Sequence, residues 1–249
     1  MLILLFLLLF DFYVSGRISS VVKGDFMSKK LFFEAIIKYL LGVVLVGLLI
    51  FLPAGTISYL NGWIFMGILF IPMLIVGVVL MIKNPKLLKE RLDSKEKQKE
   101  QSLIIKLSGL MFLAGFIIAG LDYKFSWISL PNWISYVAAI IFVLSYVMYA
   151  EVLRENSTLS RTIKVENNQK VVDTGLYGII RHPQYSASIV MFLAMPLVLG
   201  SIISFFVFLL YPILIVLRIK NEENVLMNEL DGYKDYKNKV KYRLIPFVW

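Results

Sequence analysis

Residues 186–217 decide the fold, and they read SASIVMFLAMPLVLGSIISFFVFLLYPILIVL. Residues 186–199 and 202–217 are two apolar segments that only Gly200 and Ser201 separate. Because backbone groups in lipid must pair within their own segment, each apolar segment is expected to be a helix. The short connection therefore predicts a tight helical hairpin inside a membrane.

Further apolar segments precede this hairpin, at residues 36–53, 60–82, 107–121 and 133–152. A helix needs about 20 apolar residues to cross roughly 30 Å of hydrocarbon. Hydrophobic residues make up 59% of the 249 residues, and the mean hydropathy is +0.77, more than one soluble core requires. The sequence predicts an all-α, polytopic membrane helical bundle with about six spans.

Charge along the chain predicts how these spans are oriented. The net charge is +9, and Lys and Arg concentrate in residues 83–106, 154–181 and 220–243. Short connections at residues 55–59 and 200–201 carry no Lys or Arg, and the one after Leu121 has only Lys124. The positive-inside rule therefore places the long loops and both termini in the cytosol, which an even number of spans allows. This distribution explains the basic charge without nucleic acid as a partner.

Cysteine and histidine usage excludes several kinds of site. The chain has no Cys and one His. Disulfides, thiolate catalysis, cysteine-ligated metal and multi-histidine metal sites are therefore excluded, and no metal is expected.

Composition divides the chain into three parts. Residues 1–30 form an N-terminal extension of uncertain role, since its apolar start lacks a basic leader and is too short to span a membrane. Residues 31–149 hold the first four spans and a charged cytosolic loop, while motif-like polar residues crowd residues 150–249. The last part is where chemistry is expected.

One motif, Arg181-His182-Pro183-Gln184-Tyr185, stands directly before an apolar helix. Pro183 suits the first helical turn, so His182 is expected near the N-cap. One interpretation is a helix start with a snorkelling Arg181. The other is a ligand site, because a helix N-terminus favours a carboxylate or another anionic group.

A second candidate is the pair Arg218 and Glu222, which lie four residues apart and so share one helix face. An interfacial ion pair would explain them. A charge near hydrocarbon also commonly marks a ligand site, which is the functional alternative.

Taken in order, the motifs of the C-terminal part resemble the isoprenylcysteine carboxyl methyltransferase family, membrane enzymes related to phospholipid N-methyltransferases. The motifs are Gly175-Leu176-Tyr177, Arg181 to Tyr185, Glu222-Glu223, Gly232-Tyr233 with Tyr236, and Arg243-Leu244-Ile245-Pro246. Asn84-Pro85 and Arg154-Glu155-Asn156 also resemble bacterial members. The resemblance implies a bacterial or archaeal type of cytoplasmic membrane, with the active site on the cytosolic side.

This resemblance implies methyl transfer from S-adenosylmethionine to a lipid-like or isoprenylated acceptor, a carboxylate, that enters from the surrounding membrane lipids. It assigns the following residues to the cofactor: Gln169, Lys170, Val171, Val172, Tyr177, His182, Pro183, Gln184, Tyr185 and Glu222. Arg218 matches the substrate-side arginine, and Arg218 with Glu222 forms the expected catalytic pair. The cofactor-binding region is thus the cytosolic C-terminal part.

These roles are chemically consistent with the residue types. Methyl transfer is an in-line displacement in which positioning supplies most of the catalysis, so no covalent nucleophile or metal is required. Arg218 can hold an anionic acceptor by a two-pronged contact, and Glu222 can accept hydrogen bonds from the cofactor's amine or ribose. His182 is expected to shape the pocket rather than act as a base.

Other functions remain open from the sequence. Phospholipid N-methylation uses the same fold, and NADPH-dependent membrane reductases share the hairpin and end in a similar Tyr-Arg-Ile-Ile-Pro-like segment. A non-catalytic scaffold or transporter subunit is a further alternative, although Pro72, Pro196 and Pro212 have no charge beside them in mid-span. Neither the acceptor nor the oligomeric state follows from the sequence.

Overall fold

The computed structural model describes residues 29–83, 85–92, 99–156, 165 and 169–249, and the regular structure of these residues is entirely helical. The elements are α3 (Lys29–Ala54), α4 (Leu60–Lys83), α5 (Pro85–Leu92), α6 (Lys99–Phe125), α7 (Asn132–Glu155), the 3₁₀ turn η1 (Gly175–Gly178), α8 (Pro183–Val198), α9 (Ile202–Phe208), α10 (Leu210–Glu229) and α11 (Tyr233–Lys239). The predicted all-α class is confirmed. The predictions for residues 1–28 and Asn84 lie outside the described residues.

Five stretches of the described chain are long and apolar enough to cross a membrane. They are Leu31–Ala54, Leu60–Val79, Gln101–Phe125, Asn132–Val152 and Ile202–Glu229. The remaining predicted span is α8, whose 16 residues reach about 24 Å and fall short of roughly 30 Å of hydrocarbon. The chain is thus a multi-pass membrane protein, with five long spans in the described residues where the sequence predicts about six.

The helical hairpin lies where the sequence places it, between α8 and α9. Gly200 adopts the left-handed backbone conformation, with φ of 78°, which a residue without a side chain adopts at no steric cost. The Ser201 side chain then accepts a hydrogen bond from Ser204 N, 3.1 Å away, and caps α9. The second helix is interrupted at Leu209, because Pro212 has no N–H to donate to the Phe208 carbonyl.

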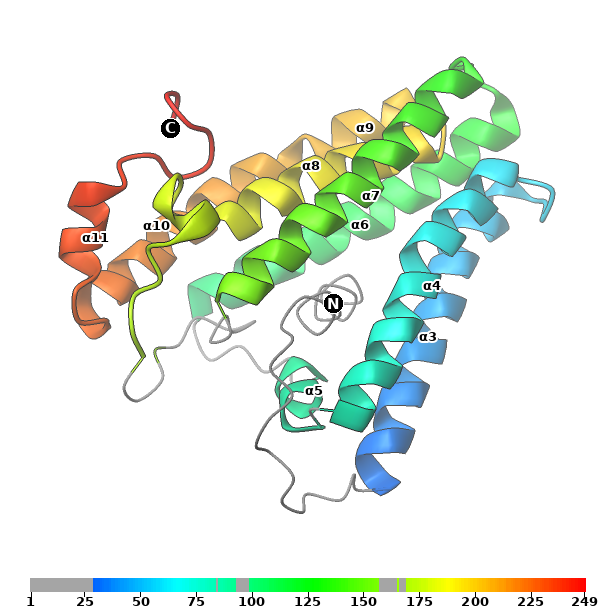
Figure 1. The fold of residues 1–249 in the computed structure, drawn as a ribbon. Helices are drawn as coiled ribbons and strands as arrows, with labels where there is room; N and C mark the ends of the chain where they lie inside the picture. The colour runs from blue at the N-terminus through cyan, green and yellow to red at the C-terminus, as the bar shows by residue number, and fades with distance from the viewer. Residues whose placement is uncertain (1–28, 84, 93–98, 157–164, 166–168) are drawn as a thin grey trace.

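Figure 1 shows α3 and α4 side by side, diverging from the long helices α6 to α10 and meeting them at one end. Helix α3 packs against α6 there. Gly120 permits this contact, because a Cβ atom at that position would lie 2.5 Å from the Ile50 carbonyl oxygen. This close approach fixes the junction between the pair α3 and α4 and the helices α6 to α10.

Buried polar contacts hold the same end of the molecule together. The Asp122 carboxylate accepts hydrogen bonds from the Ser201 hydroxyl and from Ile128 N, the latter at 3.2 Å. The Tyr59 hydroxyl donates to the Leu199 carbonyl. Asp122 is therefore paired although it is buried, as a charge near hydrocarbon must be.

Candidate functional site

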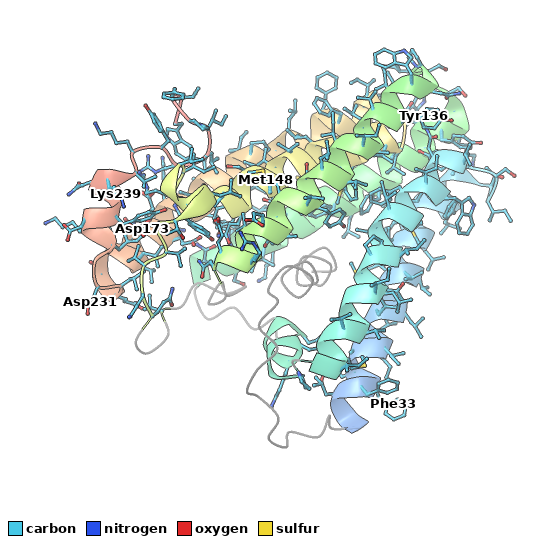
Figure 2. The ribbon with its side chains drawn as sticks, in the orientation of Figure 1. Phe33, Tyr136, Met148, Asp173, Asp231 and Lys239 are labelled. Carbon is cyan, nitrogen blue, oxygen red and sulfur yellow. The ribbon has the colours of Figure 1, made fainter. Side chains whose placement is uncertain are left out.

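The motif residues of the C-terminal part gather at the opposite end of the bundle. The start of α8, the end of α10, η1 and α11 meet there, as Figure 1 shows. In Figure 2, Asp173 and Lys239 mark this end, and Tyr136 marks the other. An ion pair of 2.7 Å joins Asp173 to Lys239, so the segment before η1 is tied to α11.

Glu223, on α10, is the centre of a buried charge network. Its Oε1 accepts from Arg181 Nε at 2.8 Å and lies 3.3 Å from His182 Nε2. Its Oε2 accepts from Arg243 Nη2 at 2.9 Å, and Lys237 Nζ lies 3.9 Å away. The carboxylate therefore joins α8, α10 and the C-terminal segment.

Arg181 is buried in this network, and each of its guanidinium nitrogens contacts the protein. It is 5% exposed, and its Nη1 donates to the carbonyl oxygens of Val240 and Lys241 at 2.7 and 2.8 Å. Its backbone N donates to the Tyr242 carbonyl at 2.8 Å. The alternative of a snorkelling Arg181 is thus wrong, because the side chain is buried and holds the C-terminal segment.

The predicted pair Arg218 and Glu222 meets at a third side chain, Tyr185. Arg218 Nε donates to the Tyr185 hydroxyl at 2.8 Å, and that hydroxyl donates to Glu222 Oε2. The guanidinium also lies 6.0 Å from the centre of the Tyr185 ring. One phenol on α8 therefore connects two charged residues one turn apart on α10.

Two further hydroxyl groups, those of Ser188 and Tyr211, fix the position of Tyr185 inside the bundle. The Ser188 hydroxyl donates to the Tyr185 carbonyl at 3.1 Å and accepts from the Tyr211 hydroxyl at 3.2 Å. Ser188 and Tyr211 are buried. The first turn of α8 is thus held from within the bundle as well as from the C-terminal segment.

The turn η1 is held by the end of α7. Glu155 Oε2 accepts from Leu176 N at 2.9 Å, and Gly175 next to it has φ of 52°. Tyr177 is buried, accepts a hydrogen bond from Asn156 Nδ2 at 3.2 Å and accepts one at its carbonyl from the Tyr236 hydroxyl at 2.8 Å. Burial raises the pKa of Tyr177 well above its ordinary value, so the phenol stays neutral.

Helix α11 packs its apolar face against the segment before η1. The hydrophobic cluster there comprises Tyr233 and Tyr236 of α11 and the flanking Leu230 and Val240, with Val171 partly buried against them. The Tyr233 hydroxyl is buried and has no hydrogen-bond partner among the described residues. Burial raises the pKa of Tyr233, so this phenol is neutral too.

Most of the predicted cofactor residues lie in two regions, the first turn of α8 and the segment before η1. His182 is the N-cap of α8 with Pro183 at its start, as expected, and Gln184 is buried in the first turn. Val171 reaches α11, whereas Lys170 is exposed. Gln169 and Val172 are half-buried.

Sequence reasoning did not foresee the roles of Glu223 and Tyr233. Glu223 was noted only as part of a motif, yet it is 3% exposed and binds several cations. The signal that could have found it was an arginine in each of two other motifs, Arg181 and Arg243, since a buried arginine needs a carboxylate partner. Within the described part of the chain, no group of three or more His, Cys, Asp or Glu side chains could hold a metal ion.

Residues 131–233 match the family described as Phospholipid methyltransferase. The resemblance to membrane methyltransferases is confirmed. The matched range contains Tyr185, Arg218 and Glu222, and it ends at Tyr233, the first residue of α11. It leaves out the C-terminal segment that the Glu223 network holds.

A solved structure and a curated protein are also similar to this chain. The eukaryotic intramembrane Ras methyltransferase, isoprenylcysteine carboxyl methyltransferase, superposes with a TM-score of 0.50 at 18% identity, over 98% of this chain and 93% of that one. At this identity the likeness establishes the fold. The delta(14)-sterol reductase of Mus musculus is 30% identical over 91 residues, which are 35% of this chain and 22% of that protein. The chain thus spans about a fifth of the length of this curated relative.

Proposed function

We propose that this protein is an integral membrane methyltransferase that transfers a methyl group from S-adenosylmethionine to a carboxylate on a lipid-like or isoprenylated acceptor. The observation that carries the proposal is the chain of contacts from Arg218 through Tyr185 to Glu222. One hydrogen-bonded unit thus carries a guanidinium, which could hold an anionic acceptor, and a carboxylate, which could hold the donor. The match of residues 131–233 to methyltransferases supports the same reaction.

Arg218 is suited to an acceptor that arrives from the lipid. It lies partly buried on α10, and the preceding Leu217, with Ile213 one turn before Leu217, is an exposed apolar side chain on the same helix. A hydrocarbon chain can lie against these residues while its carboxylate meets the guanidinium. A carboxylate accepts a methyl group as an anion, which is the form that a guanidinium holds, so we propose O-methylation rather than N-methylation.

The residues around Glu222 fit a donor that carries an amino acid and a nucleoside. S-adenosylmethionine supplies a methyl group on a sulfonium, which already has a good leaving group. Glu222 can accept hydrogen bonds from its amine or ribose. The first turn of α8, from Pro183 to Tyr185, is joined to Glu222 by the Tyr185 hydroxyl, and we expect it on the donor side of the site. Orientation by these residues supplies the catalysis.

We also propose that residues 150–249 form the catalytic region and that their end of the bundle faces the cytosol. The positive-inside rule supports this orientation, since Lys and Arg concentrate in residues 154–181 and 220–243. Residues 31–149 supply membrane helices, and we propose that a lipid-like acceptor reaches Arg218 laterally from the surrounding lipid.

Binding calorimetry with purified protein tests the donor. S-adenosylmethionine should bind, and Glu222→Ala and Tyr185→Ala should weaken binding about tenfold or more, because each removes part of the hydrogen-bonded unit. Transfer of a labelled methyl group into lipid extract then identifies the acceptor. No donor binding, together with binding of NADPH, would overturn the proposal.

The role of Arg218 is tested separately. Arg218→Ala should weaken donor binding much less than Glu222→Ala does, since Arg218 reaches Glu222 only through Tyr185, and it should lower turnover by about a hundredfold, the scale of losing one charge-stabilising contact. Donor affinity and turnover are measured on the same preparation. An equal loss of both would place Arg218 in the donor site instead.

A second candidate function is an NADPH-dependent membrane reductase, which the similarity to the Mus musculus delta(14)-sterol reductase favours. Arginines often bind the nucleotide phosphates of such cofactors. Here Arg181 and Arg243 are engaged by Glu223. This engagement favours methyl transfer, and the NADPH binding measurement above decides between the two.

A further inference from the structure

The C-terminal segment carries an exposed apolar turn, residues 245–248, which we name the apolar tip. Ile245, Phe247 and Val248 are 55%, 87% and 75% exposed, and Pro246 between them is exposed as well. Figure 1 shows the segment projecting outward from the helices. Consecutive exposed apolar residues are unfavourable in water unless a partner or lipid covers them.

The backbone holds the apolar tip in one shape. The N–H groups of Val248 and Trp249 both donate to the Ile245 carbonyl at 3.2 Å. Phe247 has φ of 66°, a left-handed conformation that costs a residue with a side chain about 1–2 kcal/mol. A glycine would adopt it without this cost. A strained and exposed phenylalanine indicates that its side chain contacts something beyond the fold.

Contacts to α8 place the apolar tip along the bundle. The Ser186 hydroxyl, in the first turn of α8, donates to the Leu244 carbonyl at 2.7 Å, and His182 N donates to the Arg243 carbonyl at 2.9 Å. Leu244 is buried in the same hydrophobic cluster as the membrane spans, and Trp249 packs against this cluster. The residues on both sides of the apolar tip are therefore fixed near the start of α8.

The length of α8 then relates the apolar tip to the bilayer. At the far end of α8, Gly200 lies next to Asn61 and Ser135, which are in the first turns of α4 and α7. This end therefore marks the opposite boundary of the spans. The 16 residues of α8 reach about 24 Å, less than the roughly 30 Å of hydrocarbon, and any tilt shortens this reach. The start of α8 thus lies no farther out than the hydrocarbon boundary, and the segment fixed to it lies there too.

Cationic and aromatic side chains flank the apolar tip. Lys241 is exposed, and the Tyr242 ring packs on Phe247 with ring centres 5.4 Å apart. The Arg243 guanidinium lies 5.0 Å from the centre of the Trp249 ring. Aromatic rings beside Lys and Arg are typical of a membrane interface, where rings lie at the headgroups and cations meet anionic lipids.

We propose that residues 245–248 insert into the bilayer beside the start of α8, with Phe247 and Val248 among the acyl chains and Lys241 at the headgroups. The lipid of the surrounding leaflet is the partner of this surface. Insertion holds the C-terminal segment against the membrane, and with it Arg243 of the Glu223 network. The inference does not depend on the proposed reaction.

Nitroxide labels on single cysteines test the insertion, because the chain has no native Cys. The protein is reconstituted in nanodiscs of phosphatidylcholine and phosphatidylglycerol. Labels at Phe247→Cys and Val248→Cys should be severalfold more accessible to molecular oxygen, which partitions into hydrocarbon, than to a water-soluble nickel chelate. Lys239→Cys, exposed on α11, is the aqueous control, and Leu144→Cys, exposed in the middle of α7, is the lipid control.

Three patterns of accessibility distinguish what covers the apolar tip. Tip labels that behave like Leu144→Cys support the insertion. Tip labels that the nickel chelate reaches as readily as Lys239→Cys would overturn it, since the tip would then lie in water. Tip labels that neither reagent reaches would overturn it too, because protein, such as a second copy of this chain, would then cover the tip.

A change at Phe247 separates insertion from a structural role of this side chain. Phe247→Ser removes the largest apolar group of the tip, so a label at Val248→Cys in that background should become severalfold less accessible to oxygen relative to the nickel chelate. The melting temperature in detergent should change little, since Phe247 is exposed. Unchanged accessibility at Val248 would contradict the insertion, and a large fall in melting temperature would assign Phe247 to the fold instead.

Discussion

At Gly175, a side chain would occupy the space that the Glu155 carboxylate fills. A Cβ atom there would lie 1.3 Å from Glu155 Oε1, and the backbone φ of 52° is already in the left-handed region. The carboxylate needs this space to accept from Leu176 N. The absence of one side chain thus lets the end of α7 hold the turn that positions Tyr177.

Gly175→Ala should therefore destabilise the protein by about 2–3 kcal/mol, from the left-handed backbone and the lost hydrogen bond. Donor binding should weaken as well, because Tyr177 moves with the turn. Thermal unfolding in detergent and calorimetry measure the two effects. Gly109→Ala is the control, since a Cβ atom at Gly109 meets nothing within 4 Å. A Gly175→Ala protein as stable as that control would show that the turn adapts.

Among the elements, α10 contributes most to the site, because adjacent residues serve different tasks. Glu222 faces Tyr185 and the proposed donor, whereas Glu223 binds Arg181 and Arg243 and holds the C-terminal segment in place. The proposed donor site thus lies next to a structural ion network. Removal of the Glu222 carboxylate should therefore weaken donor binding, whereas removal of the Glu223 carboxylate should lower stability.

Glu223→Ala should lower the free energy of unfolding by about 3–5 kcal/mol, since it leaves buried arginines without a partner. Limited proteolysis should also cut the C-terminal segment more rapidly. Glu229→Ala, at an exposed position in the last turn of the same helix, should change the stability by no more than about 0.5 kcal/mol. Similar unfolding temperatures for the two variants would contradict the structural role of Glu223.

The elements could be predicted from the sequence to the extent that local chemistry sets them. Apolar segments, the Gly200-Ser201 connection and Pro183 after His182 mark helices, a turn and an N-cap, and the structure contains each of them. Contacts across the chain could not be predicted in the same way. Arg181 and Glu223 lie 42 residues apart, so only the packing of α8 on α10 brings them together. The sequence predicts Tyr185 at the cofactor, but it does not predict that the Tyr185 hydroxyl bridges Arg218 and Glu222.

At the scale of the whole molecule, the described structure has two ends of different chemistry. One end carries the site, α11 and its lysines, and the other carries short connections and the buried Asp122 contacts (Figures 1 and 2). Such a separation agrees with a membrane protein whose cationic segments stay on one side.

Labelling of single cysteines can test this orientation, because the chain contains none. Lys239→Cys and Trp127→Cys change exposed residues, the second in the connection between α6 and α7. A membrane-impermeant maleimide should label Trp127→Cys in intact cells and Lys239→Cys only in inside-out vesicles. The reverse pattern would place the site outside the cytosol, and labelling of both from one side would contradict the span arrangement.

The Tyr185 hydroxyl also makes the two halves of the reaction energetically dependent on each other. It receives a hydrogen bond from Arg218 and gives one to Glu222, so a ligand that draws either side chain away changes what the other can offer. Occupancy by donor should therefore alter acceptor affinity by some factor, and linkage requires acceptor to alter donor affinity by the same factor. The bilayer concentration of acceptor would then set how tightly the protein holds its soluble donor.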